Sequence, residues 1–424
     1  MKIITLILLI IPIQLIAQGW ERTYESGFGR SVQQTTDGGY VITGRTDQPY
    51  TYDPGIFLIR TNSNGDTVWT KKYGGQYDDY GYSVQQTNDA GFIITGYTSL
   101  DNVNSSIYLI KTDSNGDTLW TRTYEGNGWC MGYSVKQCCD EGYIIAGFTK
   151  ISNRDRDVYL IKTDGNGDTL WTRTYGGTDS DIGYSVEQTI DGGYIIVGEA
   201  FNYFDTSYVS LIKTDSDGDT VWTKTYGETS YSRGYSVEQT SDEGYIITGV
   251  TGTYELKDLF LIKTNSNGDI IWTKTYGGIY HTKGHSVKQT IDGGYIVAGQ
   301  KYNNETGNDV YLIKTNSNGD TIWTKTYGGS ANDYGYSVQL TLDGGFIIGG
   351  MSYSINNDMM LVYLIKTDEN GIITSSTEIP VPNPTKKLIK TVDLLGREIH
   401  KPENNIPFIE IYDDGTTQKK MILK

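Results

Sequence analysis

Histidine, the residue type most often used for acid–base catalysis and metal binding, is scarce in this chain. His281, His285 and His400 are the only three in 424 residues, and the first two are spaced i, i+4 in "HTKGH". That spacing aligns two imidazole rings for zinc on a helix, but the neighbouring turn residues indicate a loop. The sequence also contains no GxSxG motif and no motif built around a Cys–His pair. It therefore predicts neither a metal site nor a catalytic site.

Carboxylates are abundant, but most recur at one place in a repeated motif. The segment "DSDGDT" (215–220) alternates acidic residues as a calcium loop does, yet sister copies carry Asn or Ser and lack the bidentate Glu of an EF-hand. We interpret the motif as a turn, and we expect no cofactor. An extracellular polysaccharide hydrolase or lyase is the alternative function. The acidic residues outside the motif are its candidates: Asp47, Asp53, Glu199, Asp205 and Glu305.

One position that recurs along the chain carries mostly aromatic side chains. It precedes a Ser-Val pair, and its occupants are Arg30, Tyr82, Tyr133, Tyr184, Tyr235, His285 and Tyr336. If the repeats close into a ring, these residues lie together at one mouth of a central channel, where aromatic faces can stack on sugars. Packing between neighbouring repeats is the alternative explanation for the tyrosines. The seven residues are the candidate ligand-binding site.

Tryptophan marks the repeat that must position these residues. It recurs every 49 to 51 residues, at Trp20, Trp69, Trp120, Trp171, Trp222, Trp272 and Trp323. Each unit contains four short strand patterns, such as "WTRTY", "YSVEQT", "GYIIVGEA" and "YVSLIKT" within residues 171–221. Four strands per ~50 residues is the period of a propeller blade. The sequence thus predicts an all-β fold, a seven-bladed β-propeller of four-stranded antiparallel blades.

The polarity of each strand predicts its place in the blade. "YSVEQT" is mostly polar and suits the innermost strand, whereas the apolar "YIIVG" and "VYLIK" suit the covered middle strands. "WTKTY" suits the outer strand, with its Trp ring facing the adjacent blade. We expect the amino-terminal "WERTY" (20–24) to complete the last blade beside residues 362–367, which removes exposed strand edges.

Two tight turns recur in every unit and should lie on one face. Asn-Gly between the third and fourth strands predicts a type I′ hairpin, and "DGGY" joins the first strand to the second. The opposite face carries connections that vary in length and content, such as "RTDQPYTYDPG" (45–55) and "FNYFDTSY" (201–208). Because binding residues concentrate in loops on a rigid scaffold, we expect any glycan or surface protein to bind on this variable-loop face.

Charge and terminal composition narrow the class of protein. A net charge of -16 repels phosphate backbones, so nucleic acid is not an expected partner. Residues 1–17 are typical of a secretory signal peptide, and no later segment is apolar enough to cross a membrane. We therefore expect export, and in an oxidising compartment a disulfide from Cys130 to Cys138 or Cys139 is one expectation.

The repeats resemble a known class of proteins. "WTKTYGGSANDYGYSVQLTLDGGFIIGG" (323–350) resembles bacterial β-propeller repeats, and "LIKTDSNGDTLW" (109–120) is similar to the strand–turn–Trp segment of quinoprotein-type propellers. The resemblance covers about residues 20–368 and implies the fold. Redox chemistry with a bound quinone is a third hypothesis, implied only by this resemblance.

The last residues resemble the C-terminal sorting domain of type IX secretion cargo, a signal of Bacteroidetes-like bacteria. The matching residues are Asn383, Pro384, Gly396, Arg397, Tyr412, Asp414 and Gly415. The resemblance implies type IX-like secretion machinery as a partner, passage through both membranes, and a secreted or cell-surface location. The expected divisions are a signal peptide (1–17), the propeller (18–378) and the sorting domain (379–424). The expected function is a non-catalytic binding or scaffold module.

Overall fold

The computed structural model describes residues 19–46, 54–75, 77–99, 104–126, 128–150, 156–202, 206–227, 231–253, 255–354, 359–373, 388–393, 397–399, 407–412 and 417–421. The chain divides into two compact units, residues 1–374 and 375–424, and each is considered by itself. Across the described ranges the regular structure consists of strands, and no helix is long and apolar enough to span a membrane.

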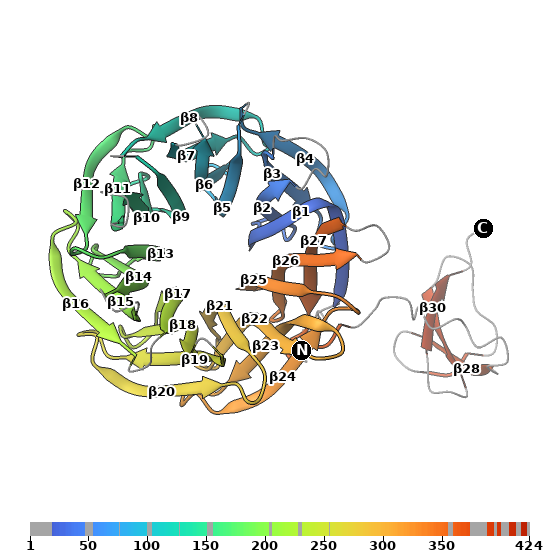
Figure 1. The fold of residues 1–424 in the computed structure, drawn as a ribbon. Coiled ribbons are helices and arrows are strands. Elements are labelled where there is room, and N and C mark those ends of the chain that lie inside the picture. The colour runs from blue at the N-terminus through green and yellow to red at the C-terminus, as the bar shows by residue number, and fades with distance from the viewer. Residues whose placement is uncertain are drawn as a thin grey trace, which may run out of the picture. The chain divides into compact units, whose positions relative to one another are not determined.

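The first unit is a β-propeller, as the sequence predicts. In the described part of the chain seven blades surround one axis, each of four antiparallel strands (Figure 1). The innermost strands are β1 (Trp20–Gln34), β5 (Asp79–Gln86), β9 (Cys130–Gln137), β13 (Asp181–Gln188), β17 (Tyr231–Gln239), β21 (Thr282–Gln289) and β25 (Asp333–Leu340). The second strands are β2 (Tyr40–Thr46), β6 (Phe92–Ser99), β10 (Tyr143–Lys150), β14 (Tyr194–Phe201), β18 (Tyr245–Gly252), β22 (Tyr295–Asn303) and β26 (Phe346–Ser354).

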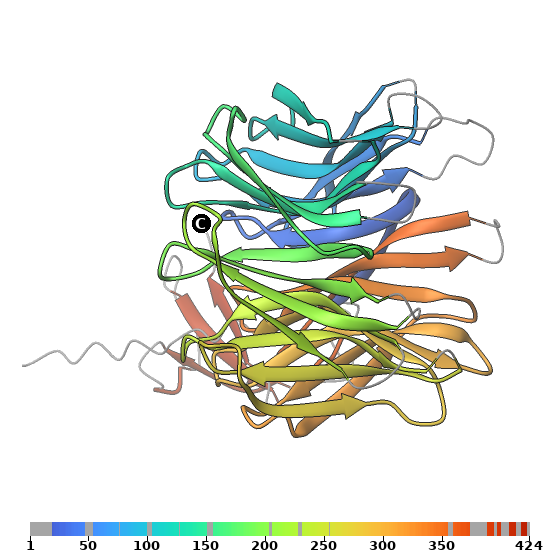
Figure 2. The same cartoon turned by 60° about the vertical axis from the view of Figure 1, so that its left-hand side comes forward.

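The third and fourth strands complete each blade, and in side view they run between the two faces of the ring (Figure 2). The third strands are β3 (Ile56–Thr61), β7 (Ser105–Thr112), β11 (Arg156–Thr163), β15 (Ser207–Thr214), β19 (Lys257–Thr264), β23 (Gly307–Thr315) and β27 (Met359–Thr367). The outer strands are β4 (Thr67–Tyr73), β8 (Thr118–Tyr124), β12 (Thr169–Tyr175), β16 (Thr220–Tyr226), β20 (Ile270–Tyr276) and β24 (Thr321–Tyr327), with the start of β1 as the seventh.

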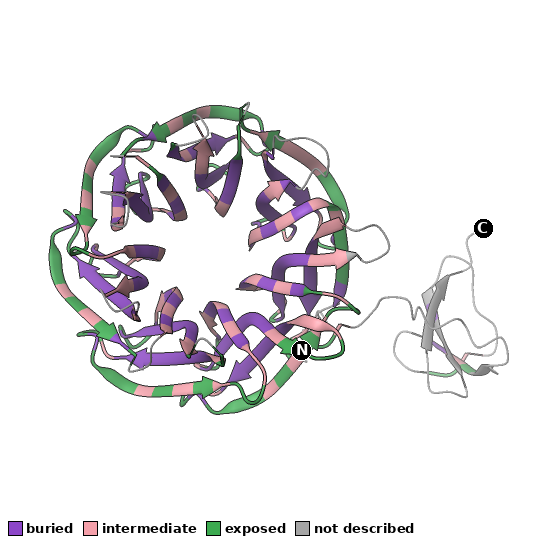
Figure 3. Cartoon of the chain, viewed as in Figure 1, coloured by how far each residue is buried: buried purple, intermediate pink, exposed green. Residues whose placement is uncertain are grey.

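Burial follows the predicted order of the strands. The second and third strands are almost wholly buried, whereas the outer strands alternate exposed and half-buried residues (Figure 3). In blade four, for example, Ile195, Val197 and Leu211 are fully buried. Neighbouring blades cover both faces of the middle strands, which explains their nearly continuous apolar sequence.

The amino-terminal tryptophan strand closes the ring, as predicted. The first part of β1 pairs with β27, joining Trp20 to Lys366, and its second part pairs with β2, joining Val32 to Ile42. One strand is therefore the outer strand of the last blade and the innermost strand of the first. This arrangement gives both blades their full set of four strands.

The outer strand of each blade is attached to the next blade through its aromatic residues. Trp171 of β12 packs edge to face against Tyr194 of the following blade, with 5.9 Å between the ring centroids. In the equivalent pairs of the other blades this distance ranges from 5.6 to 6.1 Å. Tyr175 donates a hydrogen bond of 2.6 Å to the Gly218 carbonyl. A Cβ added to Gly218 would lie 2.7 Å from the Trp171 ring, so this position excludes larger residues.

The hairpin between the third and fourth strands is not the predicted type I′ turn. Gly218 has a φ of 79°, but Asp217 does not have a positive φ, and the strand register shifts beside Thr214. The turn is a type I turn followed by a left-handed glycine and a bulge. Asp215 stabilises it by accepting hydrogen bonds from the Asp217 and Asp219 amides, which explains why Asn or Asp recurs here.

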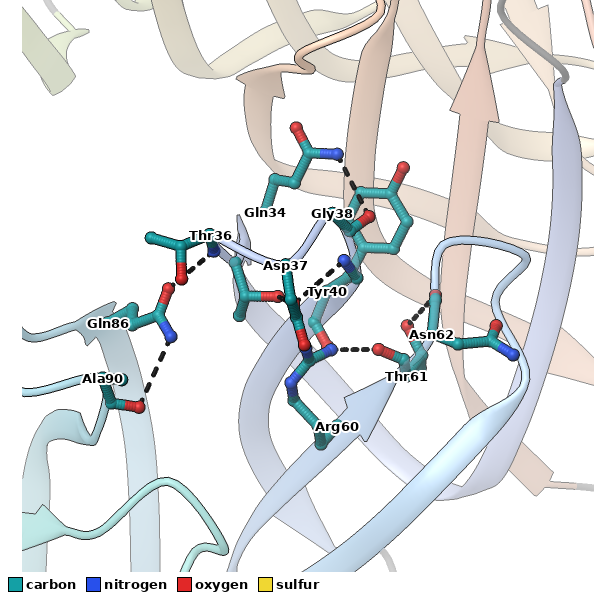
Figure 4. A network of polar contacts seen from close by, with 12 residues as sticks. Gln34, Thr36, Asp37, Gly38, Tyr40, Arg60, Thr61, Asn62, Gln86 and Ala90 are labelled. Carbon is teal, nitrogen blue, oxygen red and sulfur yellow. Dashed lines mark hydrogen bonds and ion pairs between the residues drawn. The ribbon is translucent and has the colours of Figure 1, made fainter.

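A buried cation in each third strand joins the two turns of its blade. Lys213 has a 6% exposed side chain, lies 2.9 Å from Asp191 of the "DGGY" turn and donates to the Thr214 carbonyl. In the first blade Arg60 takes this place and pairs with Asp37 (Figure 4). The equivalent cations are Lys111, Lys162, Lys263, Lys314 and Lys366. The turn face is therefore occupied by structural contacts.

The disulfide that the sequence left open is not formed, since Cys130, Cys138 and Cys139 are all free. Cys130 begins β9 and Cys138 follows its last residue, so the eight-residue strand separates the two thiols. An extended strand rises ~3.3 Å per residue, so eight residues separate the two Cα atoms by roughly 26 Å, far more than the ~7 Å that a disulfide tolerates. Cys139 lies beyond the same end of the strand.

The second unit contains a three-stranded antiparallel sheet. Its strands are β28 (Leu388–Asp393), β29 (Pro407–Tyr412) and β30 (Thr417–Met421), in that order. Val392 and Phe408 are buried in it. This agrees with the expected small β-rich C-terminal domain.

Candidate functional site

The seven residues predicted as a ring do come together at the axis. Their successive ring centroids lie 4.7–5.5 Å apart from Tyr82 to His285, and 5.1 Å separate His285 from Tyr336. Arg30 completes the circle, with its guanidinium 4.2 Å above the Tyr336 ring and a 2.7 Å hydrogen bond to Tyr80, which stacks on Tyr82. Each member from Tyr82 to Tyr336 lies midway along an innermost strand, and Arg30 lies in the second half of β1. The side chains pack on one another and remain half-buried, so the arrangement is compatible with both explanations of the tyrosines.

The members of this aromatic ring are uncharged at neutral pH except for Arg30. Burial raises the pKa of Tyr133 and of Tyr336 to about 12. Burial lowers the pKa of His285 to about 4, against the effect of its hydrogen bond to Gln300. The tyrosine hydroxyls are therefore neutral hydrogen-bonding groups, and His285 is a neutral imidazole.

Of the two predicted carboxylates that lie in the described ranges, Glu199 approaches the ring. It is 1% exposed, forms an ion pair with Arg233 and accepts a 2.8 Å hydrogen bond from Tyr184. Burial raises the pKa of Glu199, although Arg233 acts in the opposite direction. Glu305 lies exposed between β22 and β23. Asp47, Asp53 and Asp205 lie outside the described residues.

A cavity of about 540 Å³ opens beside the ring on the variable-loop face, and we call it the cationic pocket. It is lined by Lys257, His281, Lys283, His285, Gln300, Tyr302, Asn308, Tyr334 and Tyr336. These residues come from β19, β21, β22, β23 and β25, with His281 just before β21, so blades five to seven build it. Two members of the aromatic ring, His285 and Tyr336, form part of its wall.

The two lysines of the cationic pocket are poorly compensated. Burial, followed by the charge of Arg233, lowers the pKa of Lys257. Burial, Lys257 and Arg233 lower the pKa of Lys283 in the same way. The ammonium group of Lys257 also lies 4.0 Å from the Tyr231 ring centroid. The pocket therefore concentrates positive charge in a chain whose net charge is -16.

A chain of hydrogen bonds orients the polar wall of the pocket. His285 Nε2 donates to the Gln300 carbonyl at 3.1 Å, because an amide oxygen can only accept. Gln300 donates to Asn308 at 3.2 Å, and Asn308 donates to the Tyr334 hydroxyl at 3.3 Å. These contacts hold the side chains in one orientation before any ligand arrives.

The sequence analysis missed Lys257, Lys283, Gln300 and Asn308. The available signal is a departure from the repeat: Lys283 occupies the place held by Tyr80, Met131 and Ile182 in other units. Charged residues at positions that are apolar elsewhere mark the units that differ in function. Such positions become meaningful only when the blades that carry them are known to be neighbours.

Other predicted residues are placed as follows. Among the described residues no group of three His, Cys, Asp or Glu side chains is placed to hold a metal ion. In the C-terminal unit Tyr412 ends β29 opposite Leu388, and Arg397 precedes a short bridge between Glu398 and Val392. The remaining sorting-signal residues lie outside the described ranges: Asn383, Pro384, Gly396, Asp414 and Gly415.

Comparison with known proteins supports the fold. No protein-family model matches the sequence, and no curated protein matches it either. The Neurospora crassa Pan2 WD40 domain has a TM-score of 0.50 at 10% identity, covering 82% of this chain and 89% of that chain. Chaetomium thermophilum Sqt1 bound to the N-terminus of ribosomal protein L10 gives 0.50 at 11%, with 94% and 98% covered. A puromycin hydrolase gives 0.51 at 12%, with 91% and 58% covered. At these identities the likeness shows the β-propeller fold alone.

Proposed function

We propose that this chain is an exported propeller that binds a sugar-containing ligand without catalysis, at the mouth framed by the aromatic ring. The observation that carries the proposal is the cationic pocket, which combines aromatic walls with convergent, pre-oriented polar groups. Its volume of about 540 Å³ lies within the ~300–1,000 Å³ usual for small-molecule sites. On the opposite face, the repeated lysine–aspartate pairs give the turns a structural role.

A glycan array probed with the full-length chain tests this proposal. Tyr336→Ala should weaken binding about three- to tenfold, because a stacking surface is lost. Tyr133→Ala is the matched control, since it removes a ring member that does not line the pocket. If both variants lower the unfolding temperature but leave glycan binding unchanged, the tyrosines serve packing alone. Binding to a surface protein but to no glycan would also contradict the proposal.

The non-catalytic role is supported by the state of Glu199. Its ion pair with Arg233 and its hydrogen bond from Tyr184 already use its carboxylate oxygens. Most glycosidases use two carboxylates that face one bond, and Glu199 is already held by protein partners. Release of reducing ends from a bound polysaccharide would contradict this part of the proposal.

We further propose that the signal peptide directs the chain across the inner membrane and that residues 379–424 then direct type IX-like secretion. The support is the motif resemblance together with a strand unit separate from the propeller. Deleting residues 379–424 should leave the propeller in the periplasm of a bacterium that has this machinery. The intact mass of the secreted wild-type chain should reveal removal of both ends. Unchanged secretion of the deletion variant would refute the sorting role.

A further inference from the structure

The two lysines of the cationic pocket differ from the buried cations of the third strands. Six lysines and one arginine are buried in the third strands, and each pairs with an aspartate of its own blade. Arg233, beside the pocket, pairs with Glu199. Among the described residues, Lys257 and Lys283 form no such ion pair.

Two neighbouring cations without a counter-ion repel each other, and the partial burial of both side chains adds to the cost of their charge. The charges that act on them are again positive, namely Arg233 on both and Lys257 on Lys283. An anion entering the pocket would remove this cost. The long-range field of the acidic chain does not prevent this, because screening limits it to about 8 Å at physiological salt.

The rest of the pocket wall suits a sugar rather than a bare ion. Tyr334 and Tyr336 supply aromatic surface, and Gln300 and Asn308 supply amide groups held by hydrogen bonds. Aromatic faces pack against the apolar side of a pyranose, and amides bond its hydroxyls. A bare ion would use only the two ammonium groups.

We propose that the cationic pocket binds an anionic sugar residue, with its carboxylate or sulfate held between Lys257 and Lys283 and its ring against Tyr336. This inference rests on the proposed sugar-binding function and narrows it to one class of ligand. The carboxylate and sulfate forms share the same recognition chemistry, so the experiment carries one arm for each.

The test measures affinities of the full-length chain by calorimetry in 150 mM salt, on the order of physiological ionic strength. The probes are a digalacturonate, galactose 6-sulfate, neutral galactobiose and inorganic phosphate. We expect one or both anionic sugars to bind at least about tenfold more tightly than the neutral sugar. Lys283→Met and Lys257→Met should each remove about tenfold of that preference, because each deletes one of the two ammonium groups that hold the anion. Lys325→Met, on the outer strand β24, is the control with the same loss of charge.

The outcomes separate this inference from the proposed function. Equal affinity for neutral and anionic sugars, unaffected by the lysine variants, would refute the inference and leave the sugar-binding function standing. Phosphate binding as tight as that of the anionic sugars would refute the role of the sugar ring. Anionic binding that survives both lysine substitutions together, with an unfolding temperature like that of the wild type, would place the site elsewhere. Failure to bind any sugar would refute both proposals.

Discussion

The two glycines of the "DGGY" turn should differ sharply in their tolerance of a single methyl group. Gly192 has a φ of 85°, and nothing lies within 4 Å of a Cβ added there. Ala90, Glu141 and Glu243 already occupy this place in other blades. Gly193 is different, because an added Cβ would lie 2.1 Å from the Thr214 carbonyl oxygen and 2.6 Å from the Lys213 ammonium group.

The expected magnitudes follow from these two situations. Gly192→Ala carries only the cost of a left-handed backbone, about 1 kcal/mol. Gly193→Ala must displace β15 or the lysine that pairs with Asp191, and overpacking of this kind costs about 1–3 kcal/mol. Partial loss of the Lys213–Asp191 ion pair adds to this cost. Its contribution is small because the Asp191 side chain is 59% exposed, so we expect the free energy of unfolding to fall by roughly 3 kcal/mol in total.

Thermal unfolding followed by circular dichroism provides the assay. At about 2 °C per kcal/mol for a domain of this size, Gly192→Ala should lower the unfolding temperature by about 2 °C and Gly193→Ala by about 6 °C. Urea unfolding should rank the variants in the same order. Equal shifts, or a larger shift for Gly192→Ala, would refute the assignment of a conformational role to the first glycine and a steric role to the second.

Three further predictions concern closure, pH and the free thiols. Trp20→Ala should lower the free energy of unfolding by about 3 kcal/mol or more, because it empties a site that is 8% exposed; a change below about 1 kcal/mol in urea unfolding would argue against closure through this residue. Although burial opposes it, hydrogen bonds from Lys314 and Thr290 lower the pKa of Asp292 to about 2, so this carboxylate contributes stability above its unfolded pKa of ~3.9 that is lost as the pH falls towards 2. Asp292→Asn should therefore flatten the acid limb of the unfolding temperature between about pH 4 and 2, and an unchanged slope there would contradict the ion pair. One thiol per native chain, Cys139, should react rapidly with a maleimide and three after denaturation, since the other two are buried; protection of Cys139 would contradict its exposure.

The repeat itself was readable from the sequence because each blade is built from local signals. The tryptophan period, the apolar middle strands and the polar inner strand follow from residue types at short spacing, and the structure confirms the order they predict. The closure by Trp20 was also predictable. The sequence begins with an outer strand that has no blade before it, and its last unit lacks an outer strand, so the first can complete the last. The aromatic position before Ser-Val was found for the same reason.

The sequence predictions failed where a side-chain contact or the length of a strand, and not the motif alone, decides the geometry. Asn-Gly suggested a type I′ turn, but Asp215 and its equivalents direct the hairpin into a type I turn with a bulge. Lys213 belongs to a segment interpreted as apolar, and only its approach to Asp191 explains how a lysine can be buried there. A disulfide was considered because the three cysteines are close in sequence, whereas the length of β9 keeps Cys130 away from Cys138.

The sequence alone determined what repeats: an all-β chain, four strands in each unit, seven units and a ring closed by its own amino-terminal strand. The tertiary structure decided what the departures from the repeat mean. Lys257, Lys283 and Gln300 are spread over more than forty residues, and only the packing of neighbouring blades brings them to one pocket. The physical reason is that hydrogen-bonded turns and strand burial are specified within a unit, while the charge of a pocket depends on side chains contributed by several units.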